Sequence, residues 1–209
     1  MKKIILLFIT SFFCLSMHGQ KKKVTPKKSA SVVLAKAANL TAEIVKGTFY
    51  LFINNVATKD TIVLKAVDIN NLPSECKITV FTTKQTPLYL ITWNEKTITK
   101  TDLKTEEVVL VYSQIYEINS KILALGNIQK TTNITEKVFL DKLKNASETQ
   151  QRVRREGYEF ALSIEGDVTL KSKTQENKLT YNPTEKKYVD AKTVNKPTVT
   201  KSIDTKKKR

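Results

Sequence analysis

The sequence has few of the residues on which most enzyme mechanisms depend. It contains 1 histidine, 2 cysteines, 2 methionines and 5 glycines in 209 residues. The histidine, one cysteine and both methionines lie near the N-terminus, as His18, Cys14, Met1 and Met17. Without that N-terminal segment, the chain has no imidazole for a Ser–His–Asp or Cys–His nucleophile system. It also lacks the imidazole or thiolate set of a zinc site. We therefore expect no bound metal.

The N-terminus has the pattern of a secretory signal peptide. Lysines at positions 2 and 3 precede an apolar run over residues 4–15, and small or polar residues follow. The run is shorter than the roughly 20 apolar residues that a membrane-spanning helix needs. We expect cleavage near Gly19/Gln20 and no transmembrane segment in the mature chain. The protein would then be an exported bacterial protein, located in the periplasm or outside the cell.

The cysteines favour neither lipid attachment nor a disulfide. Lipoprotein processing at Cys14 would require a small residue before it, and Phe13 is large. After cleavage Cys76 would be the one remaining cysteine, so an internal disulfide could not form. We interpret Cys76 as a small buried residue, with an intermolecular disulfide or a reactive thiol as the alternative.

The remaining glycines are too dispersed for a nucleotide-binding loop. Gly47, Gly126, Gly157 and Gly166 are far apart, so the sequence contains neither a dinucleotide fingerprint nor a phosphate loop. The alternating oxygen ligands of a calcium loop are also missing. We expect no cofactor.

The formal net charge of +16 is concentrated at the two ends of the chain. Residues 20–36 hold six lysines and no acidic residue, and residues 185–209 hold nine basic and three acidic residues. Residues 37–184 have a net charge of only +2. Lysine-rich segments with little to bury are typical of disorder. They could be solvated tethers, or they could bind anionic envelope polysaccharide, anionic lipid or extracellular DNA. Because aromatic residues do not alternate with the lysines, we expect no sequence-specific nucleic-acid binding.

The body of the chain has the composition of a β protein. Threonine, valine, isoleucine and aromatic residues are abundant, as in strands. We predict a signal peptide over 1–19, a basic disordered linker over 20–38, a single β-rich domain over 39–190 and a basic disordered tail over 191–209. The fold class is mainly β, an antiparallel sandwich or partly closed barrel. The predicted strands are 41–53, 61–67, 76–83, 88–99, 106–118, 121–129 and 135–140. A C-terminal β-meander is predicted over 158–164, 167–173, 178–182 and 186–190.

One short helix is predicted near 147–156. Ser147 with Gln150 three residues later forms a capping-box pattern, and Gly157 is a common helix stop. On such a helix Arg152 and Arg155 would share one face and could hold an anion. The alternative is local pairing, since Glu148 and Arg152 have i,i+4 spacing.

A second candidate binding surface consists of aromatic residues. Tyr89, Ile91 and Trp93 would share one face of a strand. Exposed rings on a sheet can stack against sugars, whereas buried rings are core. Trp93 precedes polar residues near the end of its strand, so Trp93 and Tyr89 are our aromatic candidates for ligand binding.

Carboxylates are the remaining candidates for catalysis. Glu106 and Glu107 are neighbours on a predicted strand and should therefore point to opposite faces. We expect a non-enzymatic binding or scaffolding protein of the cell envelope, whose protein partners the sequence does not indicate. The first alternative is a polyanion-binding protein acting through its lysine-rich ends. The second is a carboxylate-based enzyme acting on polysaccharide.

Overall fold

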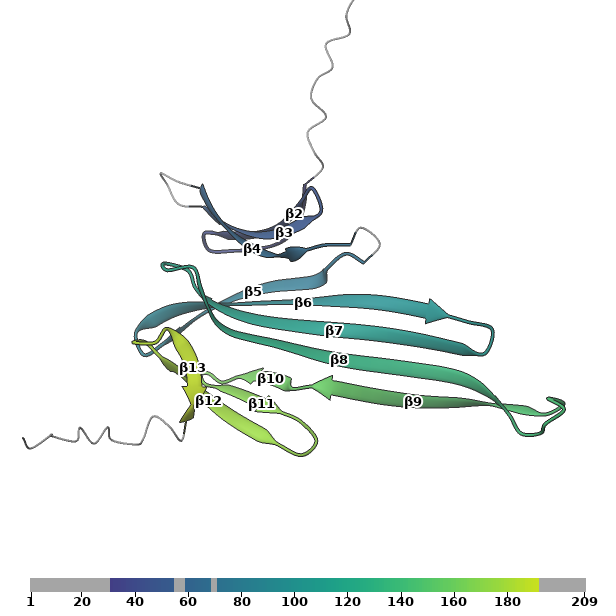
Figure 1. The fold of residues 1–209 in the computed structure, drawn as a ribbon. Helices are drawn as coiled ribbons and strands as arrows, with labels where there is room; N and C mark the ends of the chain where they lie inside the picture. The colour runs from purple at the N-terminus through teal and green to yellow at the C-terminus, as the bar shows by residue number, and fades with distance from the viewer. Residues whose placement is uncertain (1–30, 55–58, 69–70, 192–209) are drawn as a thin grey trace, which may run out of the picture. The chain divides into compact units, whose positions relative to one another are not determined.

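The computed structural model describes residues 31–54, 59–68 and 71–191, which form antiparallel strands in three sheets (Figure 1). In each sheet the strand order follows the chain. The N-terminal sheet contains β1 (Val32–Ala37), β2 (Leu40–Val45), β3 (Thr48–Asn54) and β4 (Lys59–Ala66). The central sheet contains β5 (Ser74–Thr83), β6 (Thr86–Lys100), β7 (Lys104–Glu117), β8 (Ile122–Phe139) and β9 (Ser147–Gly157). The C-terminal sheet contains β10 (Glu159–Leu162), β11 (Val168–Lys171), β12 (Glu176–Asn182) and β13 (Lys187–Asp190).

The predicted mainly β, antiparallel fold is confirmed. Each of the three sheets has two edge strands, so the strands of the described residues do not close into a barrel. The arrangement is consistent with the sandwich alternative. The C-terminal β-meander is also confirmed, since β10 to β13 pair in succession.

Two hydrophobic cores lie on opposite faces of the central sheet. One core joins the N-terminal sheet to β5, β6 and β7, and the other joins β6, β7 and β8 to the C-terminal sheet. Strand β6 contributes to both, because successive side chains of a strand point to opposite faces. Ile91 and Trp93 enter the first core, and Leu88 and Leu90 enter the second.

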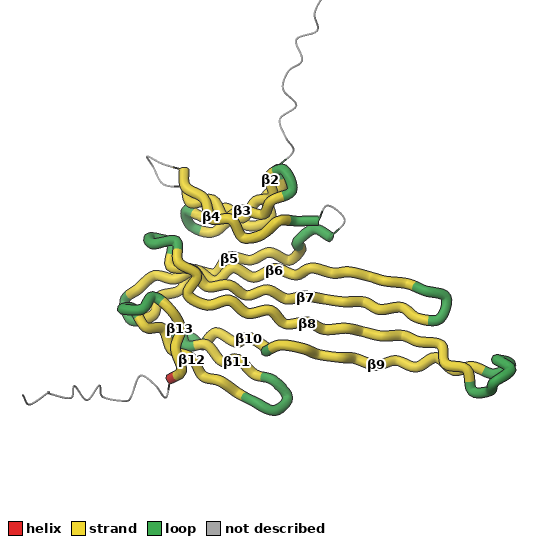
Figure 2. The backbone as a smooth tube through the Cα atoms, in the orientation of Figure 1, coloured by secondary structure: helices red, strands yellow, loops and turns green. Residues whose placement is uncertain are grey.

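The predicted strand over 41–53 is wrong in one respect, because the chain reverses within it. Lys46 and Gly47 both have positive φ, at 50° and 76°. That backbone makes the two-residue turn that matches the twist of paired strands. The segment is therefore the hairpin of β2 and β3, with Val45 paired to Thr48, and Figure 2 shows the turns between the strands.

The predicted helix near 147–156 is wrong. These residues form β9, which pairs with β8 from Ser147, opposite Phe139, to Gly157, opposite Gln129. A capping box and a terminal glycine are local signals, and a long strand partner outweighs them by supplying the backbone hydrogen bonds of the segment. Every residue of β9 is exposed, as suits a charged edge strand.

The predicted linker over 20–38 also extends too far, because β1 begins at Val32 and pairs with β2. Residues 1–30 and 192–209 lie outside the described residues, so the predicted signal peptide and C-terminal tail fall there. Among the described residues, no helix has the length and apolar character needed to cross a membrane.

The C-terminal sheet is fixed to the central sheet by a close contact at Gly166. This glycine is buried in the turn between β10 and β11 and has φ +87°. A Cβ atom there would lie 2.5 Å from the Cβ of Thr83 in β5. The Tyr188 hydroxyl donates a buried hydrogen bond to the Gly166 carbonyl at 2.7 Å. The contact therefore requires both a left-handed backbone and the absence of a side chain.

Candidate functional site

Trp93, the preferred aromatic candidate, is buried and 1% exposed. Its ring stacks on Tyr112 with centroids 4.7 Å apart and an interplanar angle of 5°. Phe49 of the N-terminal sheet meets it edge-on at 5.3 Å. In this structure the ring belongs to the core and offers no open face for a sugar.

A part-buried ion pair lies beside Trp93. The Lys65 ammonium of β4 donates to both carboxylate oxygens of Glu95 in β6, at 2.7 and 2.8 Å. The Trp93 indole N–H donates to the same carboxylate at 3.1 Å. The ammonium also lies 4.9 Å from the centre of the Tyr112 ring. We call these four residues the clasp, because they connect the N-terminal and central sheets through polar contacts at the edge of the first core.

The clasp has the chemistry of a structural contact. Burial alone would lower the pKa of Lys65, but hydrogen bonds with Glu95 and Tyr112 outweigh it and raise the pKa above its ordinary value. A lysine that holds its proton more tightly than usual is a poor general base at neutral pH. The Glu95 side chain is only 7% exposed, and the surrounding donors satisfy it.

Tyr89, the second aromatic candidate, lies at a different surface. It is half-buried, packs against the first core and lines a small cavity of about 190 Å³. Asp60 and Lys121, which form an ion pair, line the same cavity. Tyr89 and Trp93 thus share a face of β6, but Trp93 does not line the cavity that Tyr89 lines.

The structure separates the two arginine candidates. On a helix Arg152 and Arg155 would share a face, but on a strand an odd spacing places them on opposite faces. Arg152 lies opposite Ile134 and donates to Glu136 at 2.8 Å. Arg155 lies opposite Thr131 and lines a cavity on the other face. The predicted shared anion site of these two residues is therefore wrong, although Arg155 alone remains a candidate.

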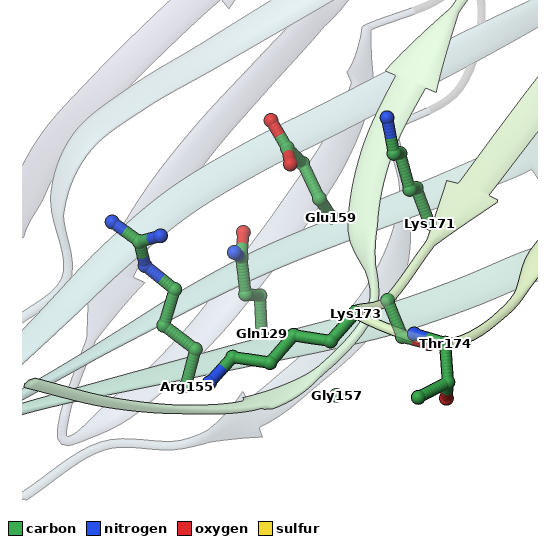
Figure 3. Close-up of a pocket in the computed structure, with 8 residues that line it drawn as sticks. Gln129, Arg155, Gly157, Glu159, Lys171, Lys173 and Thr174 are labelled. Carbon is green, nitrogen blue, oxygen red and sulfur yellow. The ribbon is translucent and has the colours of Figure 1, made fainter.

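The cavity beside Arg155 has a volume of about 370 Å³ and lies between β8 and β9 on one side and the β11–β12 hairpin on the other (Figure 3). We call it the basic groove. In Figure 3 the Lys173 side chain extends toward the base of Arg155. Its lining residues are Gln129, Arg155, Gly157, Glu159, Lys171, Ser172, Lys173 and Thr174.

The basic groove has an excess of positive charge. Arg155, Lys171 and Lys173 contribute three cations, and Glu159 contributes one carboxylate. Glu159 lies opposite Lys171 in the register of β10 and β11, yet none of the three cations forms an ion pair with another described residue. These cations can therefore meet an external anion without first breaking a contact.

Both walls of the basic groove are held by short backbone contacts. Gly157 has φ +80°, and a Cβ there would lie 2.4 Å from the Ile128 carbonyl oxygen. The buried Asn127 side chain then donates to the Tyr158 carbonyl at 2.9 Å, where the chain leaves the central sheet. On the opposite wall the Ser172 amide donates to the Gln175 carbonyl at 2.7 Å. These contacts hold the backbone next to Arg155 and Lys173 in place.

The two carboxylates considered for catalysis do not converge. Glu106 and Glu107 lie on β7, opposite Ile134 and Asn133 respectively, so they point to opposite faces as predicted. Glu106 pairs with Lys104 at 2.6 Å, which lowers the pKa of Glu106. Glu107 pairs with Lys96 at 2.9 Å.

Lys171 and Lys173 are site residues that the sequence reasoning missed. They lie on the last residue of β11 and in the turn after it, within a stretch predicted as strand 167–173. Alternation in that stretch does indicate that two lysines two residues apart share a face. Arg155 lies near that face because the chain changes direction at Gly157, between β9 and β10, and no local pattern indicates this change of direction.

Comparisons of this chain with protein-family models, with curated proteins and with solved structures found no match. No group of three or more histidine, cysteine, aspartate or glutamate side chains suited to a metal ion occurs within the described part of the chain.

Proposed function

We propose that this protein is an exported protein of the bacterial cell envelope that acts by binding or scaffolding rather than by catalysis. Export is supported by the basic, apolar and small-residue order of residues 1–19. The observation that carries the binding role is the basic groove. It gathers three cations that form no ion pair with another described residue.

Export is tested by fractionating cells that express the full chain with a C-terminal tag and sequencing the N-terminus of the product. The expected result is a periplasmic or extracellular form that begins at or near Gln20. Substituting the apolar run with lysines at Leu6 and Phe8 should retain the protein in the cytoplasm at full length. A wild-type protein found in the cytoplasm with Met1 intact would contradict the proposal.

Binding is tested by sedimenting the purified chain with isolated cell envelopes. We expect co-sedimentation that decreases as salt rises from low to physiological and higher concentrations, because contacts between exposed charges are screened. Hydrolysis of an envelope polysaccharide by the purified chain, abolished by a glutamate-to-glutamine substitution, would instead support the carboxylate-enzyme alternative.

A second candidate function is polyanion binding through the lysine-rich ends of the chain. The six lysines and absence of acidic residues over 20–36 favour it. Replacing Lys206, Lys207 and Lys208 by glutamine, together with Lys21, Lys22 and Lys23, should then weaken envelope binding strongly. If binding is unchanged in that variant, the anion contacts lie in the body of the protein.

A further inference from the structure

The two faces of β9 differ in how their charges are paired. Arg152 and Arg154, on the opposite face of β9, are each neutralised by a carboxylate, of Glu136 and Glu156 respectively, both at 2.8 Å. Arg155 has no such partner among the described residues. One face of the strand is therefore locally balanced, and the face toward the groove is open to an external anion.

The volume of the groove indicates a ligand larger than a single ion. About 370 Å³ falls within the range of ~300–1,000 Å³ in which pockets hold small organic molecules. In Figure 3 the Arg155 and Lys173 side chains lie on one side of the groove and the Lys171 side chain lies on the other, so the three cations do not surround a single point. A ligand with several negative groups along a chain fits this distribution.

The uncharged lining favours a sugar over a nucleobase. No aromatic side chain lines the groove, so the described residues provide no platform on which a nucleobase could stack. The Gln129 amide and the Thr174 hydroxyl line the groove and make no side-chain hydrogen bond within the described chain. Amide and hydroxyl groups are suitable partners for sugar hydroxyls.

From this geometry we infer that the basic groove binds an anionic polysaccharide, with Arg155, Lys171 and Lys173 contacting its acidic groups. The inference rests on the proposed binding function and assigns it a site and a ligand class. The arginine fork suits a planar carboxylate or a sulfate, and these two sources of the same chemistry are distinguished experimentally.

The test follows backbone amide signals of the full chain by NMR during titration with short probes at physiological salt. The probes are a hexamer of galacturonate, a sulfated heparin hexasaccharide, a thymidylate hexamer and neutral maltohexaose. We expect saturable shifts at Gly157, Ser172 and Thr174 with one or both acidic sugars, and none with maltohexaose. The acidic sugar that binds more tightly identifies the carboxylate or sulfate source.

The variant Arg155→Gln with Lys173→Gln should weaken that binding about tenfold, which corresponds to about 1.4 kcal/mol, because contacts of exposed charges are individually weak. The matched control is Arg152→Gln with Lys178→Gln. It removes the same charge from exposed cations that already have partners, and it should bind nearly as well as the wild type. Both variants change exposed residues, and equal melting temperatures would show that both fold.

Four results would overturn the inference. Equal weakening in the two variants, or shifts confined to residues 20–30 and 192–209, would show general or terminal electrostatic binding and leave the proposed envelope role intact. Tighter binding of the thymidylate hexamer would assign the groove to nucleic acid. Absence of any saturable shift in the groove would remove it as a site, whereas failure of export or of envelope sedimentation would instead contradict the proposed function.

Discussion

Gly166 approaches Thr83 so closely that a methyl group on the glycine would lie 2.5 Å from the threonine Cβ and 2.9 Å from its hydroxyl oxygen. The contact joins the turn between β10 and β11 to the end of β5. It therefore fixes the C-terminal sheet, and with it one wall of the basic groove, to the central sheet.

Gly166→Ala should lower the free energy of unfolding by about 2–4 kcal/mol. Left-handed backbone at a residue other than glycine costs ~1–3 kcal/mol, and overpacking against Thr83 adds to this. The measurement is urea denaturation followed by fluorescence. Gly126→Ala is the matched control: its φ is not positive, and its nearest neighbour, a Leu123 methyl carbon, would lie at an ordinary 3.6 Å. Equal losses in the two variants would contradict the packing argument.

Glu95→Gln should destabilise the protein by about 1–3 kcal/mol, because it leaves the part-buried Lys65 ammonium without its counter-ion. The loss should be smaller than for a fully buried pair, since the Lys65 side chain is 29% exposed. Replacing both residues, with Lys65→Met and Glu95→Leu, should recover part of the loss. The exposed pair of Lys96 and Glu107 provides the comparison, and Glu107→Gln should cost less than ~1 kcal/mol. A loss no larger for Glu95→Gln than for Glu107→Gln would show that the clasp is not a stabilising contact.

The stability of the protein should decrease at alkaline pH. Burial raises the pKa of Tyr116 from 10.0 to about 12, and the net effect of the clasp also raises the pKa of Lys65. Because the folded state holds these protons more tightly than the unfolded state does, the stabilisation is fully present below pH 10. It is lost as pH rises through the folded pKa values. Urea midpoints measured between pH 9 and 12 should decline, and Tyr116→Phe should flatten the decline. A constant midpoint over that range would contradict it.

Cys76 should react slowly with thiol reagents in the native state. Burial raises the pKa of its thiol from 9.0 to about 11, which reduces the reactive thiolate about 100-fold at neutral pH. The measurement is labelling with a disulfide reagent at pH 7 on a Cys14→Ser variant, before and after unfolding in urea. Rapid labelling of the native protein would instead favour the reactive-thiol alternative for Cys76.

The sequence was sufficient to predict the elements whose burial alternates with a period of two. The C-terminal sheet is one example, because Phe160, Leu162, Val168 and Leu170 sit at alternating positions and pack in the second core. Glu106 and Glu107 are another, because a strand places adjacent residues on opposite faces whatever their surroundings.

The errors occurred where a long-range partner decides the local structure. The segment 147–157 has helix signals at both ends and no hydrophobic alternation, and its strand conformation depends on pairing with β8. Because of that error, Arg155 was predicted on the same face as Arg152, and the basic groove was not predicted. The burial of Trp93 likewise depends on Phe49, which is distant in the sequence and belongs to another sheet.

The division of β6 between two cores constrains its alignment with its neighbours. A slip of one residue between β6 and either β5 or β7 would turn Trp93 and Ile91 toward the C-terminal sheet and Leu88 and Leu90 toward the N-terminal sheet. The same slip would therefore disrupt the side-chain packing of both cores. An insertion or deletion within 88–95 should therefore be much more destabilising than one in the loop at 101–103. That loop joins β6 to β7 and contributes no residue to either core.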